Sequence, residues 1–318
     1  MSEVASATAP AGIPIQDLMD AGVHFGHLKK KWNPKMLPYI FMERKGIHII
    51  DLNKTNEELV RAADAMKNIA RSGRKILFVA TKKQAKEIVA DLARSVNMPY
   101  VAERWLGGML TNFTTIKKSI KKMQTIEKML SDAAVGITKK ERLVLTREKE
   151  KLDKVLGGIE NLSRVPAALF LVDVGHEHIA LAEAKRLGLV TFGMVDTNCD
   201  PNLVDYFIPA NDDASKSVSI ITQHLVDAIK EGLAERKADG NEDKDEEFAD
   251  RSDRSDRIRE SNAEGKEGGG KEREGGGRRR GGGGSGGGGG NRGGSGGGGN
   301  RGGGGGGGNR GGGGGRPK

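Results

Sequence analysis

The sequence predicts an α/β protein built on a parallel β-sheet with helices on both faces. Short apolar segments at 75–81, 167–174 and 189–196 alternate with segments of helical periodicity. Continuous apolar strands are typical of parallel sheets, because such strands are buried on both faces. A lysine-rich stretch at about 111–160 interrupts this alternation and carries two apolar stripes at helical spacing. We therefore expect a helical insertion within the α/β domain.

The chain that precedes the sheet divides into an arm, two helices and a hairpin. Residues 1–12 are small and lack an apolar core, which predicts a flexible arm. Residues 14–22 predict a short helix that ends at a glycine. Two apolar runs in 39–52 flank the turn residues 43–46 and predict a β-hairpin. Apolar residues then recur at helical spacing over 53–73 and predict a longer helix.

Five strands and three helices are expected to form the α/β domain. The predicted strands, in chain order, are 75–81, 99–103, 167–174, 189–196 and 206–209. The predicted helices are 82–96, 176–188 and 212–237. Strands that alternate with helices in this way are typical of a parallel sheet.

The insertion has the pattern of two antiparallel helices that pack as a short coiled coil. Gly136 lies in the segment that connects them. The stripe residues are Ile116, Ile120, Met123 and Leu130 in the first helix and Leu145, Leu152, Leu156 and Ile159 in the second. The other faces are rich in lysine, namely Lys117, Lys118, Lys121, Lys122, Lys128, Lys139 and Lys140. Such a surface is either a solvated polar face or a basic arm that reaches a partner.

The composition changes abruptly from Ala238 onward. Of the 49 glycines, 35 lie in the 81 residues from 238 to 318, and apolar residues almost vanish there. Such a segment cannot bury enough apolar surface to offset its ordering entropy, so we expect a disordered tail, first charged and then rich in glycine and arginine. The domain is then expected to span 13–237. Arginine–glycine segments of this kind either bind RNA loosely or act as solubilising extensions.

Charge and cysteine content narrow the class of protein. The net charge is +9, of which +7 lies on residues 1–237, and a basic excess favours polyanionic partners, although many enzymes share it. Cys199 is the single cysteine, which excludes a disulfide within the chain and fits a reducing cytosol. No apolar run reaches the roughly 20 residues that a membrane-spanning helix needs. We expect a cytoplasmic protein with no membrane partner.

The sequence offers weak support for an enzyme. No GxGxxG follows a predicted strand and no GxxxxGK[ST] occurs, so the usual phosphate-binding loops are missing. Two loops at predicted strand ends hold Asp173, His176, Asp196 and Cys199, which are the residue types of a thiol hydrolase. These residue types also serve as helix caps and turn formers, and no motif fixes a catalytic role for them. The alternative function is therefore that of a cytosolic doubly wound enzyme with its crevice at these four residues.

Histidines raise the question of a metal site. The candidate ligands are His24, His27, His176, His178 and Cys199. A zinc site needs three or four ligands that converge, and the HxxH and HxH spacings alone do not supply them. We expect no cofactor and no metal, with a structural zinc as the remaining alternative.

Two segments, 22–36 and 104–113, combine basic residues with aromatic ones. Lysine and arginine neutralise phosphate, and polar side chains add hydrogen bonds to phosphate and sugar. Trp32 and Trp105 either stack on a base or anchor their segments to the core, and we favour anchoring. The candidate RNA-binding residues are His24, His27, Lys29, Lys30, Lys31, Trp32, Asn33, Lys35, Arg104, Thr111, Asn112, Lys117, Lys118 and Lys121.

Several motifs occur in an order that matches a known family. They are "AGVHFGH", "WNPKM", "ERWLGGMLTNF", "TKKE", "VGHEHIALAEA", "VDTNCDPN" and "IPANDDA". Together they closely resemble the bacterial small-subunit (30S) ribosomal proteins of the S-two family. The resemblance runs from about Ile13 to Lys237 and leaves the glycine/arginine-rich tail outside.

The resemblance implies a three-layer α/β/α domain with a five-stranded parallel sheet in the flavodoxin-like order 2-1-3-4-5 and an inserted antiparallel helical hairpin. It also implies a structural, non-enzymatic constituent of the small ribosomal subunit that supports subunit assembly and translation. The implied partners are small-subunit ribosomal RNA and other small-subunit ribosomal proteins, including the large mRNA-binding one. No small-molecule substrate is implied, because a fold shared with many enzymes does not fix function.

Overall fold

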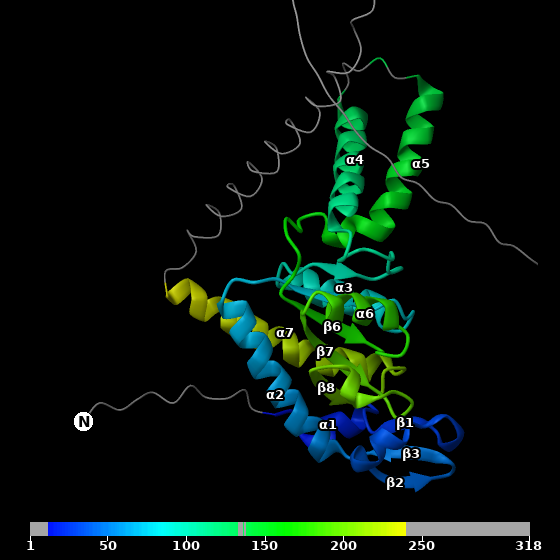
Figure 1. The fold of residues 1–318 in the computed structure, drawn as a ribbon, viewed down its shortest axis with the longest axis vertical. Coiled ribbons are helices and arrows are strands. Elements are labelled where there is room, and N and C mark those ends of the chain that lie inside the picture. The colour runs from blue at the N-terminus through cyan, green and yellow to red at the C-terminus, as the bar shows by residue number, and fades with distance from the viewer. Residues whose placement is uncertain (1–11, 133–135, 137, 240–318) are drawn as a thin grey trace, which may run out of the picture. The chain divides into compact units, whose positions relative to one another are not determined.

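A five-stranded parallel sheet forms the centre of the computed structural model, which describes residues 12–132, 136 and 138–239 (Figure 1). Its strands are β4 (Ile76–Val79), β5 (Tyr100–Val101), β6 (Ala168–Val172), β7 (Val190–Val195) and β8 (Tyr206–Pro209). They lie in the order β5-β4-β6-β7-β8, and all four pairings are parallel. Helices flank this sheet, so the predicted parallel α/β fold is confirmed.

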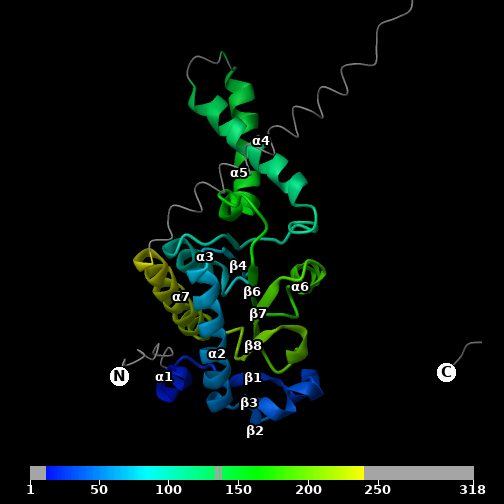
Figure 2. The ribbon, with the colours of Figure 1, turned by 60° about the vertical axis from the view of Figure 1, so that its left-hand side comes forward.

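The two faces of the sheet are covered differently (Figure 2). Three helices, α2 (Leu52–Arg71), α3 (Lys86–Ser95) and α7 (Ser215–Ala238), pack on one face and bury the rings of Phe78, Phe170 and Phe192. The opposite face is covered by the short helix α6 (His178–Arg186) together with irregular segments from two other parts of the chain. The side chains buried there include Leu77, Leu169, Trp105, Met109 and Met36.

A small antiparallel sheet precedes the parallel sheet along the chain. It consists of β1 (Phe25–Leu28), β2 (Ile40–Arg44) and β3 (Ile47–Ile50) in the order β1-β3-β2. The expected hairpin is present as β2 and β3, with Lys45 and Gly46 in the positive-φ conformation of the turn. The short helix α1 (Ile15–Asp20) comes before this sheet.

The basic segment 22–36 contains β1, a first 3-10 helix and the start of a second. The two 3-10 helices are η1 (Lys29–Lys31) and η2 (Pro34–Tyr39). The sequence does not indicate β1, because four residues with a glycine and a histidine carry no strand periodicity. Pairing with Ile47 and Ile49 of β3 decides the conformation instead.

The insertion forms α4 (Phe113–Ser131) and α5 (Lys139–Leu156), followed by the 3-10 turn η3 (Gly157–Ile159). The two helices pack against each other, and an ion pair joins Lys149 to Glu127. A capping box at Thr138 starts α5. The buried residues of α4 are Ile116, Ile120, Met123 and Ile126. The first three were expected, whereas the fourth is Ile126 and the expected Leu130 is only half-buried.

Other boundaries differ by a few residues from those expected. Helix α3 begins at Lys86 rather than at 82, because turns occupy residues 82–85. Strand β5 has two residues where five were expected. Helix α7 runs to Ala238 and is capped at Asp239, so the first two residues of the expected tail belong to the domain. The rest of the tail and the expected arm, except Gly12, lie outside the described residues. No helix in the described ranges has the length and apolar content to cross a membrane.

Gly232 provides a test of the closest helix packing. A Cβ at Gly232 would lie 2.3 Å from the backbone oxygen of Lys67, where α7 crosses α2. Alanine normally stabilises a helix interior by about 0.5–1 kcal/mol relative to glycine. Because overpacking against backbone costs about 1–3 kcal/mol, we expect Gly232→Ala to lower the free energy of unfolding in urea.

The matched control is Gly107→Ala, because no atom lies within 4 Å of a Cβ at that position and the substitution is sterically free. Equal stability of the two variants would show that the helices do not pack as closely as described.

Candidate nucleic-acid interface

The loop that follows β7 holds the basic segment 22–36 in place. Thr197 accepts the His27 N–H at its hydroxyl oxygen over 2.8 Å and the Asn33 N–H at its carbonyl over 2.7 Å. Gly26 lies so close to Thr197 that a Cβ would come within 2.6 Å of its methyl group. Glycine is therefore required for this contact between β1 and the loop after β7.

The two histidines of this segment face the protein. Nδ1 of His27 lies 2.9 Å from Asp196, and its Nε2 lies 3.5 Å from Asp213. The hydrogen bond to Asp196 raises the pKa of His27, with nearby carboxylates adding to this and burial opposing it. The His24 ring packs against the Phe25 ring in a tilted arrangement with 4.0 Å between centroids, and burial lowers the pKa of His24. Both histidines therefore help to shape the segment.

The lysines of the segment differ in whether a carboxylate already neutralises them. Lys29 lies 2.6 Å from Glu43, and Lys35 lies 2.6 Å from Asp200. Lys30 and Lys31 are exposed and form no ion pair within the part of the chain that the structure describes. These two ammonium groups are therefore available to an external anion.

Trp32 and Asn33 fix the path of the segment between those lysines. The half-buried Trp32 ring packs 5.2 Å from His48 on β3, which is the anchoring role favoured from the sequence. The side chain of Asn33 caps η2 by accepting the Lys35 N–H over 3.0 Å.

A single carboxylate, that of Glu183 on α6, organises the second basic segment. Its Oε1 accepts the indole N–H of Trp105 and the N–H of Gly108 over 3.0 and 2.7 Å. Its Oε2 accepts the N–H groups of Leu110 and Thr111, both over 3.0 Å, and the Thr111 hydroxyl over 3.1 Å. Burial alone would raise the pKa of Glu183, but these hydrogen bonds outweigh it and hold the pKa below its ordinary value.

The predicted contact residues near the hairpin have distinct surroundings. Arg104 is exposed and has no ion pair among the described residues. The Thr111 hydroxyl donates a hydrogen bond to Glu183, and the Asn112 side chain accepts the Thr115 hydroxyl over 2.9 Å at the start of α4.

The predicted lysines lie on α4 itself. Lys117 lies over the Phe113 ring at 5.7 Å from its centroid. Lys118 and Lys121 are exposed on α4.

The four residues of the enzymatic alternative do not form a catalytic set. The Asp173 carboxylate accepts two backbone N–H groups of its own loop and lies 2.7 Å from Lys82. Asp196 pairs with His27 rather than with His176, whose side chain is exposed. Burial raises the pKa of the Cys199 thiol to about 12, and the charge of Asp173 adds to this. A thiol with a raised pKa is the opposite of an activated nucleophile.

Lys82 fills the crevice at the carboxyl ends of the strands. It lies within hydrogen-bonding distance of Asp173, Asp212 and Asp213, at 2.7, 2.8 and 2.9 Å. Burial lowers the pKa of Lys82, but these three bonds outweigh it and raise the pKa, so the ammonium stays charged. Burial raises the pKa of Asp212 to about 7, with the charges of Asp173 and Asp196 contributing. The place where a doubly wound enzyme binds its ligand is thus occupied by the protein's own ion pairs.

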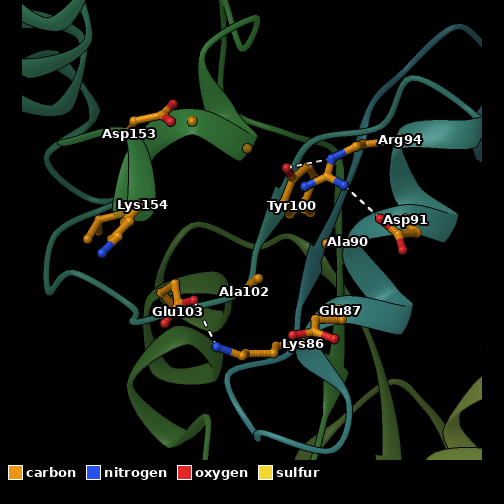
Figure 3. A pocket seen from close by; sticks show the side chains of 13 residues that line it. Lys86, Glu87, Ala90, Asp91, Arg94, Tyr100, Ala102, Glu103, Asp153 and Lys154 are labelled. Carbon is orange, nitrogen blue, oxygen red and sulfur yellow. Dashed lines mark hydrogen bonds and ion pairs between the residues drawn. The ribbon is translucent and has the colours of Figure 1, made fainter. Parts of the chain in front are cut away.

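Metal ligation and pockets add little to the enzymatic alternative. In the described ranges, no three histidine, cysteine or acidic side chains are grouped so that they could hold a metal ion. A groove of about 510 Å³ lies between α3, β5 and the lower end of α5 (Figure 3). Lys86 pairs with Glu103 there, and Arg94 with Asp91 and the Tyr100 hydroxyl. Its lining is mostly charged, unlike the apolar lining of small-molecule sites.

Three residues that organise the site were missed from the sequence, namely Glu183, Thr197 and Lys82. Each acts on partners far along the chain, such as Thr197 on His27 and Lys82 on Asp212, 170 and 130 residues away. The one local signal was the position of Glu183 on the otherwise apolar, inward face of its helix. A charged residue at such a position needs a buried partner.

The fold and the site define an α/β protein whose strand-end crevice is filled by its own ion pairs and whose exposed cations lie on segments that the domain holds in place. The profile of the family described as ribosomal protein S2 matches residues 18–232. The chain belongs to this family.

Curated relatives agree with this assignment, and each carries the name small ribosomal subunit protein uS2. The relative from Cytophaga hutchinsonii is 63% identical over 233 residues, which cover 73% of this chain and 92% of the relative. The Parabacteroides distasonis protein is 61% identical over 228 residues, covering 71% and 82%. The Christiangramia forsetii protein is 56% identical over 244 residues, covering 76% and 82%. The family is structural, so the enzymatic alternative is not supported.

Glu183 generates a prediction about stability and pH. We expect Glu183→Gln to lower the free energy of unfolding by about 2 kcal/mol at pH 7, because the charge-assisted bonds to buried donors weaken. The depressed pKa of Glu183 means that this contribution is present above pH 4.5 and is lost as the pH falls through the lower folded pKa.

Urea unfolding at pH 7 and below pH 4.5 measures the effect, with the exposed Glu87→Gln as the matched control. A difference between wild type and Glu183→Gln that does not shrink at the lower pH would contradict the depressed pKa.

The buried thiol of Cys199 allows a prediction about its rate of alkylation. As the only cysteine, it can be followed by iodoacetamide labelling and mass spectrometry of the intact chain. The raised pKa leaves few thiolates, so we expect labelling of the folded protein at pH 8 to be at least about 100-fold slower than in urea. Labelling at comparable rates would show an accessible, ionised thiol and would revive the enzymatic alternative.

Proposed function

We propose that this protein binds ribosomal RNA of the small subunit through its two rigidly held basic segments and the lysine-bearing side of α4. The observation that carries the proposal is the presence of exposed, unneutralised cations at Lys30, Lys31 and Arg104 on segments that the domain holds in place. The mechanism is phosphate neutralisation with shape matching and no turnover. In this role the chain is a structural constituent of the small ribosomal subunit on cytoplasmic ribosomes.

The proposed phosphate contacts are ranked by their surroundings. Lys30, Lys31, Arg104 and Lys118 are the strongest, because no carboxylate among the described residues competes for them. Lys29 and Lys35 can contact phosphate only in competition with Glu43 and Asp200. The remaining predicted residues, His24, His27, Trp32, Asn33, Thr111, Asn112, Lys117 and Lys121, contribute to RNA binding mainly by fixing the two segments and the base of α4.

The finer fold assignment supports the same role. With the parallel strands numbered along the chain, the order β5-β4-β6-β7-β8 corresponds to the flavodoxin-like 2-1-3-4-5. We infer that α4 and α5 are the inserted antiparallel hairpin of the family, and their mutual packing supports this. The hairpin would carry Lys118 and its neighbours to RNA at a distance from the sheet.

Protein partners are proposed for the outer face of the small sheet. Phe25 and Met42 flank Ile49 across the three strands and are 48% and 47% exposed. Leu28, Leu37 and Phe41 are also exposed apolar residues of this region. Contiguous exposed apolar surface marks protein contacts. We propose that neighbouring small-subunit proteins, including the large mRNA-binding one, bind here.

The test of RNA binding uses Lys30→Gln/Lys31→Gln and small subunits depleted of this protein. We expect affinity at 0.1–0.2 M salt to fall on the order of tenfold, and the slope of log K against log salt to flatten by about 1–2 units. The exposed pair Lys216→Gln/Lys230→Gln on α7 is the charge-matched control and should bind as wild type. Failure of the wild-type chain to bind the depleted subunits would refute the proposed function.

A further inference from the structure

The outer surface of α6 is positively charged, although the composition of this segment is close to neutral. The segment 176–186 contains two acidic residues, two basic residues and two histidines, which is close to neutral. Both acidic side chains are buried, Glu177 at 4% and Glu183 at 8% exposure. The Glu177 carboxylate accepts the N–H and the hydroxyl of Thr81, and Glu183 holds the segment after Trp105. No carboxylate of α6 therefore reaches solvent.

The exposed positions of α6 form one stripe. His178, Ala182, Lys185 and Arg186 are exposed and recur at spacings of three and four residues, Ile179 is exposed beside them at 49%, and the exposed His176 lies just before the helix. None of the four charged or imidazole side chains has a hydrogen bond or ion pair within the described ranges. The stripe presents two permanent cations and two imidazoles without a compensating acid.

The opposite side of the domain shows the contrasting arrangement. Apart from Lys216, the cations on α2, α3 and α7 have partners within the described residues, and that of Lys54 is the Pro38 carbonyl. The ion pairs are Arg61–Glu58, Lys67–Glu231, Arg71–Asp239, Lys86–Glu103, Arg94–Asp91 and Lys230–Asp227. A solvated helix surface ordinarily intersperses both charge signs in this way. The stripe on α6 departs from it, which is the electrostatic signature of a surface that meets phosphate.

The α6 stripe adjoins the proposed interface. Glu183 binds Trp105 and Thr111 from the inner side of α6, so Arg104 lies beside this helix. The hairpin base, α6 and the segment 29–38 lie on the same side of the sheet, away from α2 and α7 (Figure 2). Helix α6 therefore lies on the side of the sheet that also carries the two basic segments identified from the sequence.

We propose that the outer stripe of α6, formed by His176, His178, Lys185 and Arg186, binds the phosphate backbone of the ribosomal RNA and joins the two basic segments into one continuous contact surface. This inference rests on the proposed function. It assigns RNA contact to His176 and His178, which were considered as enzyme or metal residues from the sequence, and to Lys185 and Arg186, which were not candidates. The exposed cations without an exposed carboxylate favour RNA over a protein partner, because protein contact surfaces are depleted of lysine at their centres.

The experiment compares Lys185→Gln/Arg186→Gln with wild type in binding to small subunits depleted of this protein. Both substitutions lie on the solvent side of α6, so circular dichroism and the melting temperature should remain those of the wild type. We expect affinity to fall on the order of tenfold and the slope of log K against log salt to flatten by about 1–2 units. The control Arg61→Gln/Lys216→Gln removes the same two charges from the opposite side and should leave both values unchanged.

The outcomes separate the two proposals. Wild-type binding with no difference between the α6 variant and its control would overturn the inference and leave the proposed function standing. Loss of affinity with an unchanged salt slope would place a protein neighbour on α6 and would also overturn it. Absence of wild-type binding would refute the proposed function itself.

A second measurement needs no variant. Amine acylation of the wild-type chain, free and bound to subunits, can be followed by mass spectrometry at Lys185 and at Lys216, both exposed in the free protein. We expect Lys185 to become protected at least about fivefold on binding, because a phosphate-paired ammonium is shielded from reagent, while Lys216 reacts as before. Equal labelling of Lys185 in both states would overturn the inference even if the double variant failed to fold.

Discussion

The proposed interface depends on the buried carboxylate of Glu183. Five hydrogen bonds converge on it from the segment that leads into α4, so one side chain fixes Trp105, the turn at Gly108 and the base of the hairpin. The same carboxylate points inward from α6 and leaves the outer side of that helix cationic. A buried charge is tolerated only when donors surround it, and here the donors are the backbone N–H groups that would otherwise be unsatisfied in a turn packed on the sheet.

The crevice at the strand ends shows why an enzyme-like scaffold need not be an enzyme. Lys82 and the aspartates around it, together with the His27–Asp196 pair, join β4, β6, β7 and β8 to the small sheet. Groups that could act on a substrate instead neutralise one another, and Cys199 is buried beneath them. The proposed function uses the outer surface instead, where segments that the crevice residues hold in place present their unpaired lysines.

Much of the fold could be predicted because its signals are local. The fully buried strands β4, β6 and β7 are continuous apolar runs, and α2, α4 and α7 repeat apolar residues at helical spacing. Strand β1 was missed because its pairing partners, Ile49 for Phe25 and Ile47 for Leu28, are far along the chain and its own four residues are ambiguous. The candidate site was predicted at the level of segments only. Lys30 and Lys35 are indistinguishable in sequence, and only the contact with Asp200, 165 residues along the chain, neutralises one of them.

The sequence by itself determined the family, the alternation of strands and helices, two further lysine-rich helices and the basic character of two segments. These follow from composition, periodicity and motif order, which are properties of neighbouring residues. Only the tertiary structure decided which cations are free, which acids are buried, and that the exposed side of α6 carries cations without an exposed carboxylate. The physical reason is that charge becomes a surface property only after folding has paired or buried each carboxylate, and those pairings join residues far apart in the chain.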